Sequence, residues 1–376
     1  MDSTPPRHPD DDLGHYLQLM VAHGASDLFL SSGSAPALKV QGVVRRLPEG
    51  ALDAVQTQRL AYSVMRETQI REFESTLECD LAIALPGLGR FRVNVYRQRG
   101  DVAVVVRHIN AKIPSLEQLK LPPVCAKLAQ LKRGLVLVVG AAGSGKSTTL
   151  AALLDHRNHN ATGHILTVED PMEFEHAHGT GIVAQREVGL DTRSFDEALR
   201  RAMREAPDVI MIGEIRDRAT MQHAMAYAET GHLCVSTLHA NNANQAIQRI
   251  LNFFPETAHR QVLMDLSLNL KGVVGQRLIR SAAGTLVPAV EVMLLSPYIS
   301  ELIQKGQTDE LKDVMAKSTE LGMCTFDQSL YELFERGELT LDQALESADS
   351  RTDLSLRIRL HHGQRPSTAG LRVAAG

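Results

Sequence analysis

The chain has 376 residues, 44% of them hydrophobic and 22% charged, so we expect two or three ordinary globular domains, each large enough to bury a core. The formal net charge of −4 offers no basic surplus for holding a nucleic acid, and the four widely spaced cysteines favour reduced, buried thiols over a zinc ribbon or a disulfide framework. No apolar run reaches the length of a membrane span and the first residues lack the apolar core of a signal peptide, which predicts a cytoplasmic protein.

Both ends of the chain are poor in core-forming side chains. Residues 1–12 are rich in proline and aspartate, and residues 361–376 contain few large apolar side chains. We therefore expect both tails to be disordered. Residues 13–112 predict a small α+β domain, which begins with a helix and continues with short strands and a second helix.

The end of this domain predicts a β-hairpin. Phe91, Val93 and Val95 alternate with Arg92 and Asn94, and the stretch RQRGD supplies a turn before a second valine-rich run. Successive side chains of a strand point to opposite faces, so the arginine is expected on the face away from the apolar core.

The remaining chain predicts an α/β domain followed by helices. Residues 113–134 contain two proline signals and predict a linker followed by a short helix. In residues 135–285, apolar runs alternate with helical stretches, which is the pattern of a mostly parallel sheet. Residues 286–360 predict an all-α subdomain, with capping boxes that begin at Thr325 and Thr340.

The stretch LVLVVGAAGSGKSTTLAALL joins an apolar run, a glycine-rich bend and a helix-forming run. Its centre fits G-x-x-x-x-G-K-[ST] in the strand-to-helix context that a phosphate-binding loop requires, and so predicts ATP or GTP binding. Lys146 is expected to reach the β- and γ-phosphate oxygens and Ser147 to coordinate Mg²⁺. The residues predicted to contact the nucleotide are Gly140, Ala141, Ala142, Gly143, Ser144, Gly145, Lys146, Ser147 and Thr148.

A second apolar run, DVIMI, ends in an acidic segment. In the usual form of this motif an Asp at the strand end holds Mg²⁺, but here that position is Gly213 and Glu214 follows it. A glutamate at this point suits orientation or deprotonation of the attacking water, so Glu214 is predicted to be the general base. The alternative is a solvated carboxylate at a strand end.

Two further strands are predicted to end in candidate site residues. Glu169 and Asp170 end the run HILTVED, where one of them could orient the metal through its water shell or could simply cap the next turn. His232 and His239 bound the run LCVSTL, on opposite faces of a regular strand, and are not expected to share a metal. His239 is predicted to hydrogen-bond the γ-phosphate and His232 to be structural, and a structural role for both is the alternative.

These motifs, in this order, resemble the secretion ATPase superfamily of type II secretion, type IV pili and conjugation. They are the phosphate loop, the acidic box TVEDPMEFEH, the segment GEIRD and the histidine box GHLCVSTLHANNA. Within the superfamily the chain is most similar to the PilT/PilU family of pilus retraction motors. Its segment YISELIQKG lacks the two arginines of the PilT-type motif and resembles the PilU branch.

The resemblance implies a PAS-like N-terminal domain, a RecA-like ATPase core and a C-terminal helical subdomain. It implies an ATP-hydrolysing, Mg²⁺-dependent hexamer that powers pilus retraction and twitching motility. The implied partners are further copies of the chain, a PilT paralogue and an inner-membrane platform protein. The charge of −4 and the lack of an amphipathic anchor in the sequence predict docking on a protein platform, with no lipid anchor. It also implies that Arg92 and Arg107 reach the γ-phosphate, where guanidinium groups stabilise charge; arginines on a solvated strand face are the alternative.

Three other functions stay open from the sequence. The chain could retract pili independently, as PilT-type motors do. It could translocate nucleic acid, as in the conjugation branch, although the charge of −4 gives no reason to expect direct nucleic-acid contact. It could also be a regulatory adaptor with a vestigial ATPase, although all four motifs look intact.

Overall fold

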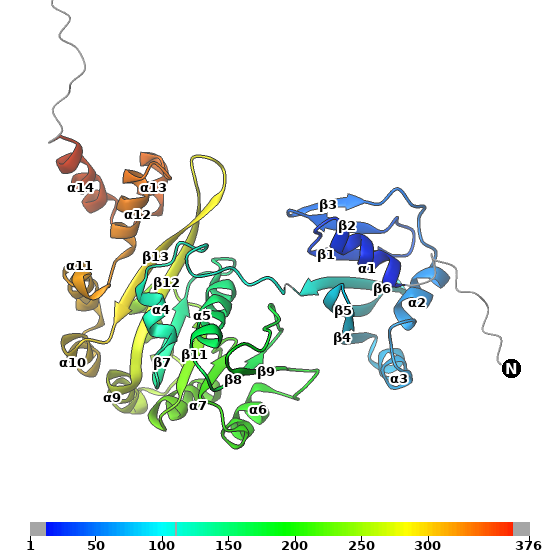
Figure 1. Cartoon of the computed structure of the whole chain (residues 1–376), viewed down its shortest axis with the longest axis horizontal. Helices are drawn as coiled ribbons and strands as arrows, with labels where there is room; N and C mark the ends of the chain where they lie inside the picture. Colours follow the sequence, from blue (N-terminus) through cyan, green and yellow to red (C-terminus); the bar gives the residue numbers. More distant parts are fainter. Residues whose placement is uncertain (1–12, 110, 364–376) are drawn as a thin grey trace, which may run out of the picture. The chain divides into compact units, whose positions relative to one another are not determined.

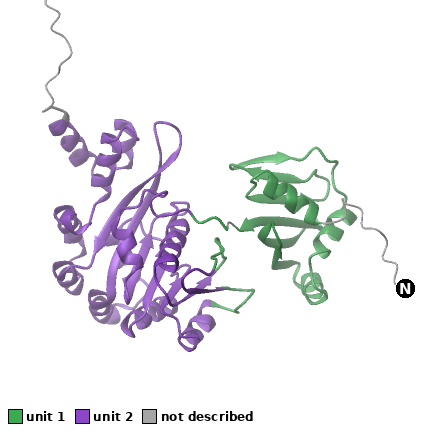
Figure 2. Cartoon of the chain, in the orientation of Figure 1, with its two compact units in different colours: residues 1–113, 170–177, 186–194 green, residues 114–169, 178–185, 195–376 purple. Residues whose placement is uncertain are grey.

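The computed structural model describes residues 13–109 and 111–363. These residues form two compact units, drawn in two colours in Figure 2. Unit 1 contains the residues up to 113 together with residues 170–177 and 186–194, and unit 2 contains the rest of the chain.

The two predicted tails fall largely outside this description. Residues 1–12 and 364–376 lie outside the described residues. The sequence predicts the second tail from residue 361, but helix α14 (Arg351–Gly363) continues three residues further. This helix is held by Leu354 and Ile358, which are buried in the core of the C-terminal helices.

Unit 1 is an antiparallel sheet with three helices, in the strand order β3-β2-β1-β6-β5-β4 (Figure 1). Its elements are α1 (Leu13–Ala22), β1 (Asp27–Ser31), β2 (Ala37–Val40), β3 (Val43–Arg46), α2 (Ala54–Tyr62), α3 (Glu67–Thr76), β4 (Glu78–Leu85), β5 (Gly89–Gln98) and β6 (Asp101–Ile109). Along β5, Phe91, Val93 and Val95 are buried, and Arg92 and Asn94 between them are half-buried. The predicted hairpin and its two faces are therefore confirmed.

Unit 2 is built on a seven-stranded sheet in the order β13-β12-β7-β11-β10-β8-β9. Its first elements are α4 (Val124–Ala129), β7 (Gly134–Val139), α5 (Lys146–Asn160), β8 (His164–Glu169), β9 (Ile182–Glu187), α6 (Phe195–Ala202), β10 (Val209–Ile212), α7 (Arg218–Glu229), β11 (Leu233–Leu238), α8 (Ala243–Leu251), α9 (His259–Asn269), β12 (Leu270–Arg280) and β13 (Leu286–Leu294). β12, β7, β11, β10 and β8 pair in parallel, which confirms the predicted α/β pattern. Parallel strands end at one edge of a sheet, and ligands of such folds bind outside that edge.

The sequence predicts helices from residue 286, but that boundary is wrong. Residues 286–294 form β13, which pairs antiparallel with β12 as a hairpin. Its apolar side chains are buried on both faces, and such a short continuous apolar run cannot be told from a buried helix by its period. The helices are α10 (Pro297–Lys305), α11 (Leu311–Lys317), α12 (Phe326–Glu335), α13 (Leu341–Ser347) and α14.

The C-terminal helices begin where the sequence predicts their caps. Thr325 and Thr340 each accept from the backbone of the third helical residue, Gln328 and Gln343, whose side chains accept in return from the cap backbone. Both predicted capping boxes are confirmed. Phe326 and other apolar residues of these helices share a core with the outer part of the β12–β13 hairpin.

The cysteines and helices of the described residues give two further findings. All four cysteines are free thiols, and burial raises the pKa of both Cys125 and Cys324 to about 12. Within residues 13–109 and 111–363, every helix falls short of the length and apolarity that crossing a bilayer requires.

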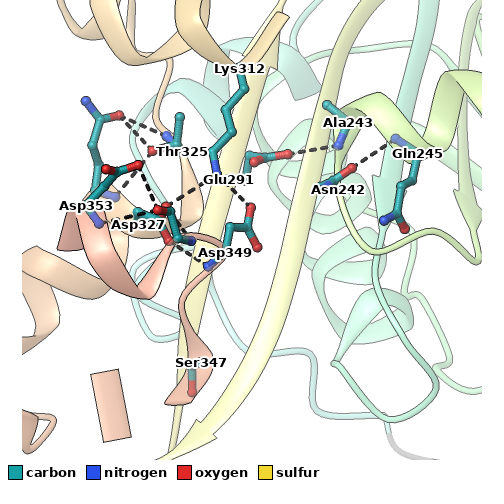
Figure 3. Close-up of polar contacts among 12 residues, drawn as sticks. Asn242, Ala243, Gln245, Glu291, Lys312, Thr325, Asp327, Ser347, Asp349 and Asp353 are labelled. Carbon is teal, nitrogen blue, oxygen red and sulfur yellow. Dashed lines mark hydrogen bonds and ion pairs between the residues drawn. The ribbon is translucent and has the colours of Figure 1, made fainter. Parts of the chain in front are cut away.

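Glu291 is a buried acid in the middle of β13, only 3% exposed. Its Oε1 accepts a hydrogen bond of 2.8 Å from the backbone N–H of Ala243, the first residue of α8 (Figure 3). Burial raises the pKa of this carboxyl to about 7, and the neighbouring Asp349 adds to the rise, whereas the hydrogen bond and Arg277 oppose it. The strand thus holds a group that titrates near neutral pH.

Glu291→Gln is expected to stabilise unit 2 increasingly as pH rises. In the unfolded chain the Glu291 carboxyl has the ordinary glutamate pKa of 4.5, and in the folded protein its pKa is about 7. Between these two pH values the carboxyl is therefore protonated in the folded state and ionised in the unfolded state. Wild-type stability therefore falls through this window, whereas the amide does not titrate and keeps an acceptor for the helix. The difference in free energy of unfolding should grow by about 2 to 3 kcal/mol from pH 5 to pH 8 in urea titrations. A difference that stays constant with pH would contradict the assignment.

Candidate nucleotide-binding and hydrolysis site

The predicted phosphate loop joins the end of β7 to the start of α5. Gly143 and Gly145 adopt left-handed backbone, with φ of 74° and 86°, and Lys146 begins the helix. The ammonium of Lys146 donates to the carbonyl of Ala141 at 2.8 Å, and the side chain is largely buried. Ser147 and Thr148 form the first turn of α5 with it.

The loop fits a bound phosphate chain on two grounds. The helix behind it is fifteen residues long and directs its first backbone N–H groups toward the loop. The hydroxyl oxygen of Ser144 is buried and, within the described part of the chain, has no hydrogen-bond partner. A phosphate oxygen would supply the acceptor that this O–H group needs.

Strand β12 packs directly against this loop. The hydroxyl of Thr149 donates to Oε1 of Gln276 at 2.5 Å, and the amide nitrogen of Gln276 lies 2.9 Å from where a β-carbon at Gly145 would stand. Gln276 is itself buried. Gln276 was not predicted as a site residue, and its one local signal in the sequence is a polar side chain inside an apolar run.

A pocket of about 260 Å³ opens beside the loop. One wall is the phosphate loop itself, and the other comes from β12 and from the segment that follows β11. The residues that line it are Ala141, Ala142, Gly143, Ser144, Asn241, Gln276, Arg277 and Leu278.

Glu214 and His239 meet at the ends of two neighbouring strands. Nε2 of His239 lies 3.1 Å from Oε1 of Glu214, and Nε of Arg216 donates to Oε2 of the same carboxylate at 2.8 Å. The backbone N–H of Ile215 and the hydroxyl of Thr237 tie this segment to β11, at 3.0 and 2.6 Å. Both oxygens of Glu214 are therefore held, and the carboxylate has a defined direction.

Glu169 ends β8 and is buried. Its Oε1 accepts from the hydroxyl of Thr167 at 2.8 Å and from the side-chain amide of Gln185, on β9, at 3.2 Å. Gln185 was not predicted from the sequence, because nothing local places β9 beside β8. Asp170, the next residue, is exposed and lies in unit 1.

His232 lies at the opposite end of β11 from His239. Its Nδ1 is 3.2 Å from the hydroxyl of Thr230, and its backbone N–H donates to Tyr227 at 3.0 Å. The structure therefore separates the two histidines by the length of the strand. In the described ranges, no three His, Cys, Asp or Glu residues group into a metal-binding cluster.

Arg92 and Arg107 lie side by side on unit 1, as direct cross-strand neighbours in β5 and β6. Nε of Arg107 donates to Oδ1 of Asp27 at 2.8 Å, and this aspartate is only 5% exposed. A terminal nitrogen of Arg92 is 3.7 Å from Oδ1 of Asp80. The four side chains line a depression of about 290 Å³. Their reach to a γ-phosphate stays a prediction.

A strand, a glycine loop and a helix at the carboxyl edge of a parallel sheet, with a glutamate on a neighbouring strand, define a P-loop nucleotide-binding protein. A family model described as type II/IV secretion system protein matches residues 12–326. The chain therefore belongs to this family.

Relatives and solved structures agree with this membership. The chain is 54% identical over 345 residues to the type IV pilus ATPase PilU of Pseudomonas aeruginosa, covering 92% of this chain and 90% of the relative. It is 41% identical over 337 residues to the retraction ATPase PilT of that organism, covering 90% and 98%. The crystal structure of the pilus retraction motor PilT with bound ADP matches with a TM-score of 0.85 and 39% identity, covering 91% of this chain and 98% of that one.

His239→Ala is expected to lower kcat for ATP hydrolysis by about tenfold or more, with a smaller change in KM, because Glu214 loses the group that orients it. The measurement is steady-state phosphate release. His232→Ala is the matched control, since that imidazole contacts the hydroxyl of Thr230 at the other end of the same strand. Equal losses in the two variants would refute a role for His239 in orientation.

Proposed function

We propose that this chain is an ATP-hydrolysing motor that powers type IV pilus retraction, in the branch of PilU. Identity to PilU of P. aeruginosa, at 54%, exceeds identity to PilT, at 41%. Family membership and the likeness to an ADP-bound retraction motor support ATP as the substrate.

The observation that carries the hydrolytic function is the contact between Glu214 and His239 beside the phosphate loop. Strand register places the end of β11 next to the end of β7, and the end of β10 next to that of β11. A carboxylate fixed at that point can orient a water and accept its proton, while the loop holds the phosphate chain. Position and direction are the main contributions that a protein makes to phosphoryl transfer.

Mg²⁺ fits the oxygen donors at this edge. Ser147 would hold the ion through its hydroxyl, and Glu169 would orient the water shell, since Mg²⁺ prefers oxygen ligands and keeps several waters. The ion would neutralise charge on the phosphates. Lys146 would contact the β- and γ-phosphate oxygens, and His239 would hold the direction of Glu214 and contact the γ-phosphate.

Arg92 and Arg107 are proposed to complete the site by contacting the γ-phosphate. Guanidinium groups stabilise the charge that spreads over the equatorial oxygens during phosphoryl transfer. Because these arginines stand on unit 1 and the phosphate loop on unit 2, hydrolysis would change the forces between two folded units. That change is how we propose the motor converts a chemical step into movement.

The proposed assembly is a homohexamer on the cytoplasmic side of the inner membrane. It would act together with a PilT paralogue and dock on the platform protein of the pilus. Identity to both retraction ATPases over at least 90% of this chain supports a shared assembly and shared partners.

Lys146→Ala and Glu214→Gln are expected to fail in different ways. Lys146→Ala should weaken nucleotide binding and abolish hydrolysis, whereas Glu214→Gln should lower kcat by about 100-fold or more and leave ATP bound. ATP retention on filters and phosphate release separate the two outcomes. Lys132→Ala and Glu229→Gln, at exposed positions, are the matched controls. Normal turnover in both site variants would overturn the site assignment.

Pilus retraction in cells tests the biological assignment. A strain that lacks the gene is complemented with the wild type or with Lys146→Ala, with and without its PilT paralogue, and retraction is scored on single cells. We expect the wild type to restore retraction only when the paralogue is present. Restoration by Lys146→Ala would indicate an adaptor, and unchanged retraction in every background would contradict the pilus assignment.

A further inference from the structure

Two adjacent polar residues of β12 serve opposite faces of the sheet. Gln276 binds the hydroxyl of Thr149 and packs on the phosphate loop. Arg277 is next in sequence, and successive side chains of a strand point to opposite faces. Arg277 also lines the pocket beside the loop, but its guanidinium contacts the C-terminal helices. Neighbouring residues of one strand therefore contact the phosphate loop and those helices.

Arg277 is fixed by three contacts from the C-terminal helices. Nη1 donates to the carbonyl of Ser347 at 3.0 Å, and Nη2 donates to Oδ1 of Asp349 at 2.6 Å. The guanidinium carbon lies 3.8 Å from the centre of the Phe326 ring. A planar fork that donates twice and stacks on a ring has one orientation, which a lysine ammonium cannot reproduce.

Asp349 in turn belongs to an ion cluster that joins three segments (Figure 3). Nζ of Lys312, on α11, lies 3.2 Å from Asp349 and 3.3 Å from Asp327, on α12. Oδ1 of Asp327 accepts from the backbone N–H of Asp349 at 2.8 Å. The side chains of Asp327 and Asp349 are each only 16% exposed, so solvent screens these contacts weakly. The cluster holds α11, α12 and the α13–α14 connection as one body against β12.

We infer that the pair Gln276–Arg277 couples nucleotide binding at the phosphate loop to the C-terminal helical subdomain. Gln276 is a positioning residue for the loop, and Arg277 fixes the same stretch of backbone to the ion cluster. Displacement of the helices shifts β12 and therefore Gln276, and ordering of the loop by a nucleotide restrains β12 and therefore the helices. The inference rests on the proposed function, since it requires a nucleotide in the loop.

Coupling of this kind is reciprocal, so it can be measured from both ends. In the full-length wild type, saturating ADP should slow hydrogen exchange in peptides that cover residues 341–350, far in sequence from the loop. Arg277→Lys should remove that ADP-dependent protection and weaken ADP binding, measured by calorimetry, by about fivefold or more. Because Arg277 also lines the pocket beside the loop, Asp349→Asn is the deciding variant: Asp349 lies outside that lining. The substitution keeps the shape of the side chain, removes its charge, and should produce the same two changes to a smaller extent.

Controls separate coupling from stability. Arg280→Lys is the matched control on the same strand. Among the contacts of the described residues, Arg280 donates only to the carbonyl of Gly284, in its own hairpin. This variant should leave ADP binding and the ADP-dependent protection unchanged. Gln276→Met should weaken ADP binding and remove the distant protection, because the loop loses its contact with β12.

Two results would overturn the inference. One is normal ADP binding by the wild type with no change in exchange at residues 341–350. The other is that Arg277→Lys lowers the melting temperature but leaves the ADP dissociation constant and the ADP-dependent protection as in the wild type. That result would mean that Arg277 has a purely structural role. A wild type that binds no ADP would overturn the proposed function as well, so the two failures are distinguishable.

Discussion

The close approach of β12 to the end of β7 is the constraint on which the site depends. At Gly140 the carbonyl oxygen of Gln276 lies 2.5 Å from where a β-carbon would stand, and φ is 159°. Any larger residue would push β12 away from β7 and would move the side chain of Gln276, which accepts from Thr149. The first glycine of the phosphate loop is therefore required by packing, in addition to the turn that follows it.

Close packing also bears on where the acids of the site stand. A β-carbon at Gly213 would lie 3.3 Å from Cα of Glu169, so a side chain there would press on β8. The carboxylates occupy the next residue, Glu214, and the end of the neighbouring strand. Glu169 is buried and accepts from the hydroxyl of Thr167 and the amide of Gln185, whereas a histidine and an arginine contact Glu214. In the function proposed above the two acids have different tasks, one toward the water shell of a bound metal and one toward the attacking water.

The sequence predicts those parts of the site whose reactive or binding residues come soon after a strand in the chain. The phosphate loop, Glu214 and His239 each directly follow an apolar run, and parallel strands bring such positions to one edge. Gln276 could not be predicted in this way, because its partner Thr149 is 127 residues away and meets it only through the pairing of β12 with β7. The strand at residues 286–294 was not predicted for a different reason. Its side chains are buried on both faces, and this removes the alternation of apolar and polar residues that identifies a strand.

The arginine pair of unit 1 illustrates a last physical point. Arg107 is 65% exposed, yet its Nε is fixed by the buried Asp27, and register places Arg92 directly beside it. Two like charges on adjacent strands repel, and the two aspartates offset that repulsion. A guanidinium has five N–H donors, and the ion pair of Arg107 with Asp27 uses the one on Nε, so the four donors of its terminal nitrogens are not used in that pair. If these arginines serve a phosphate as proposed, the aspartates orient them in advance, which lowers the entropy lost when the phosphate is bound.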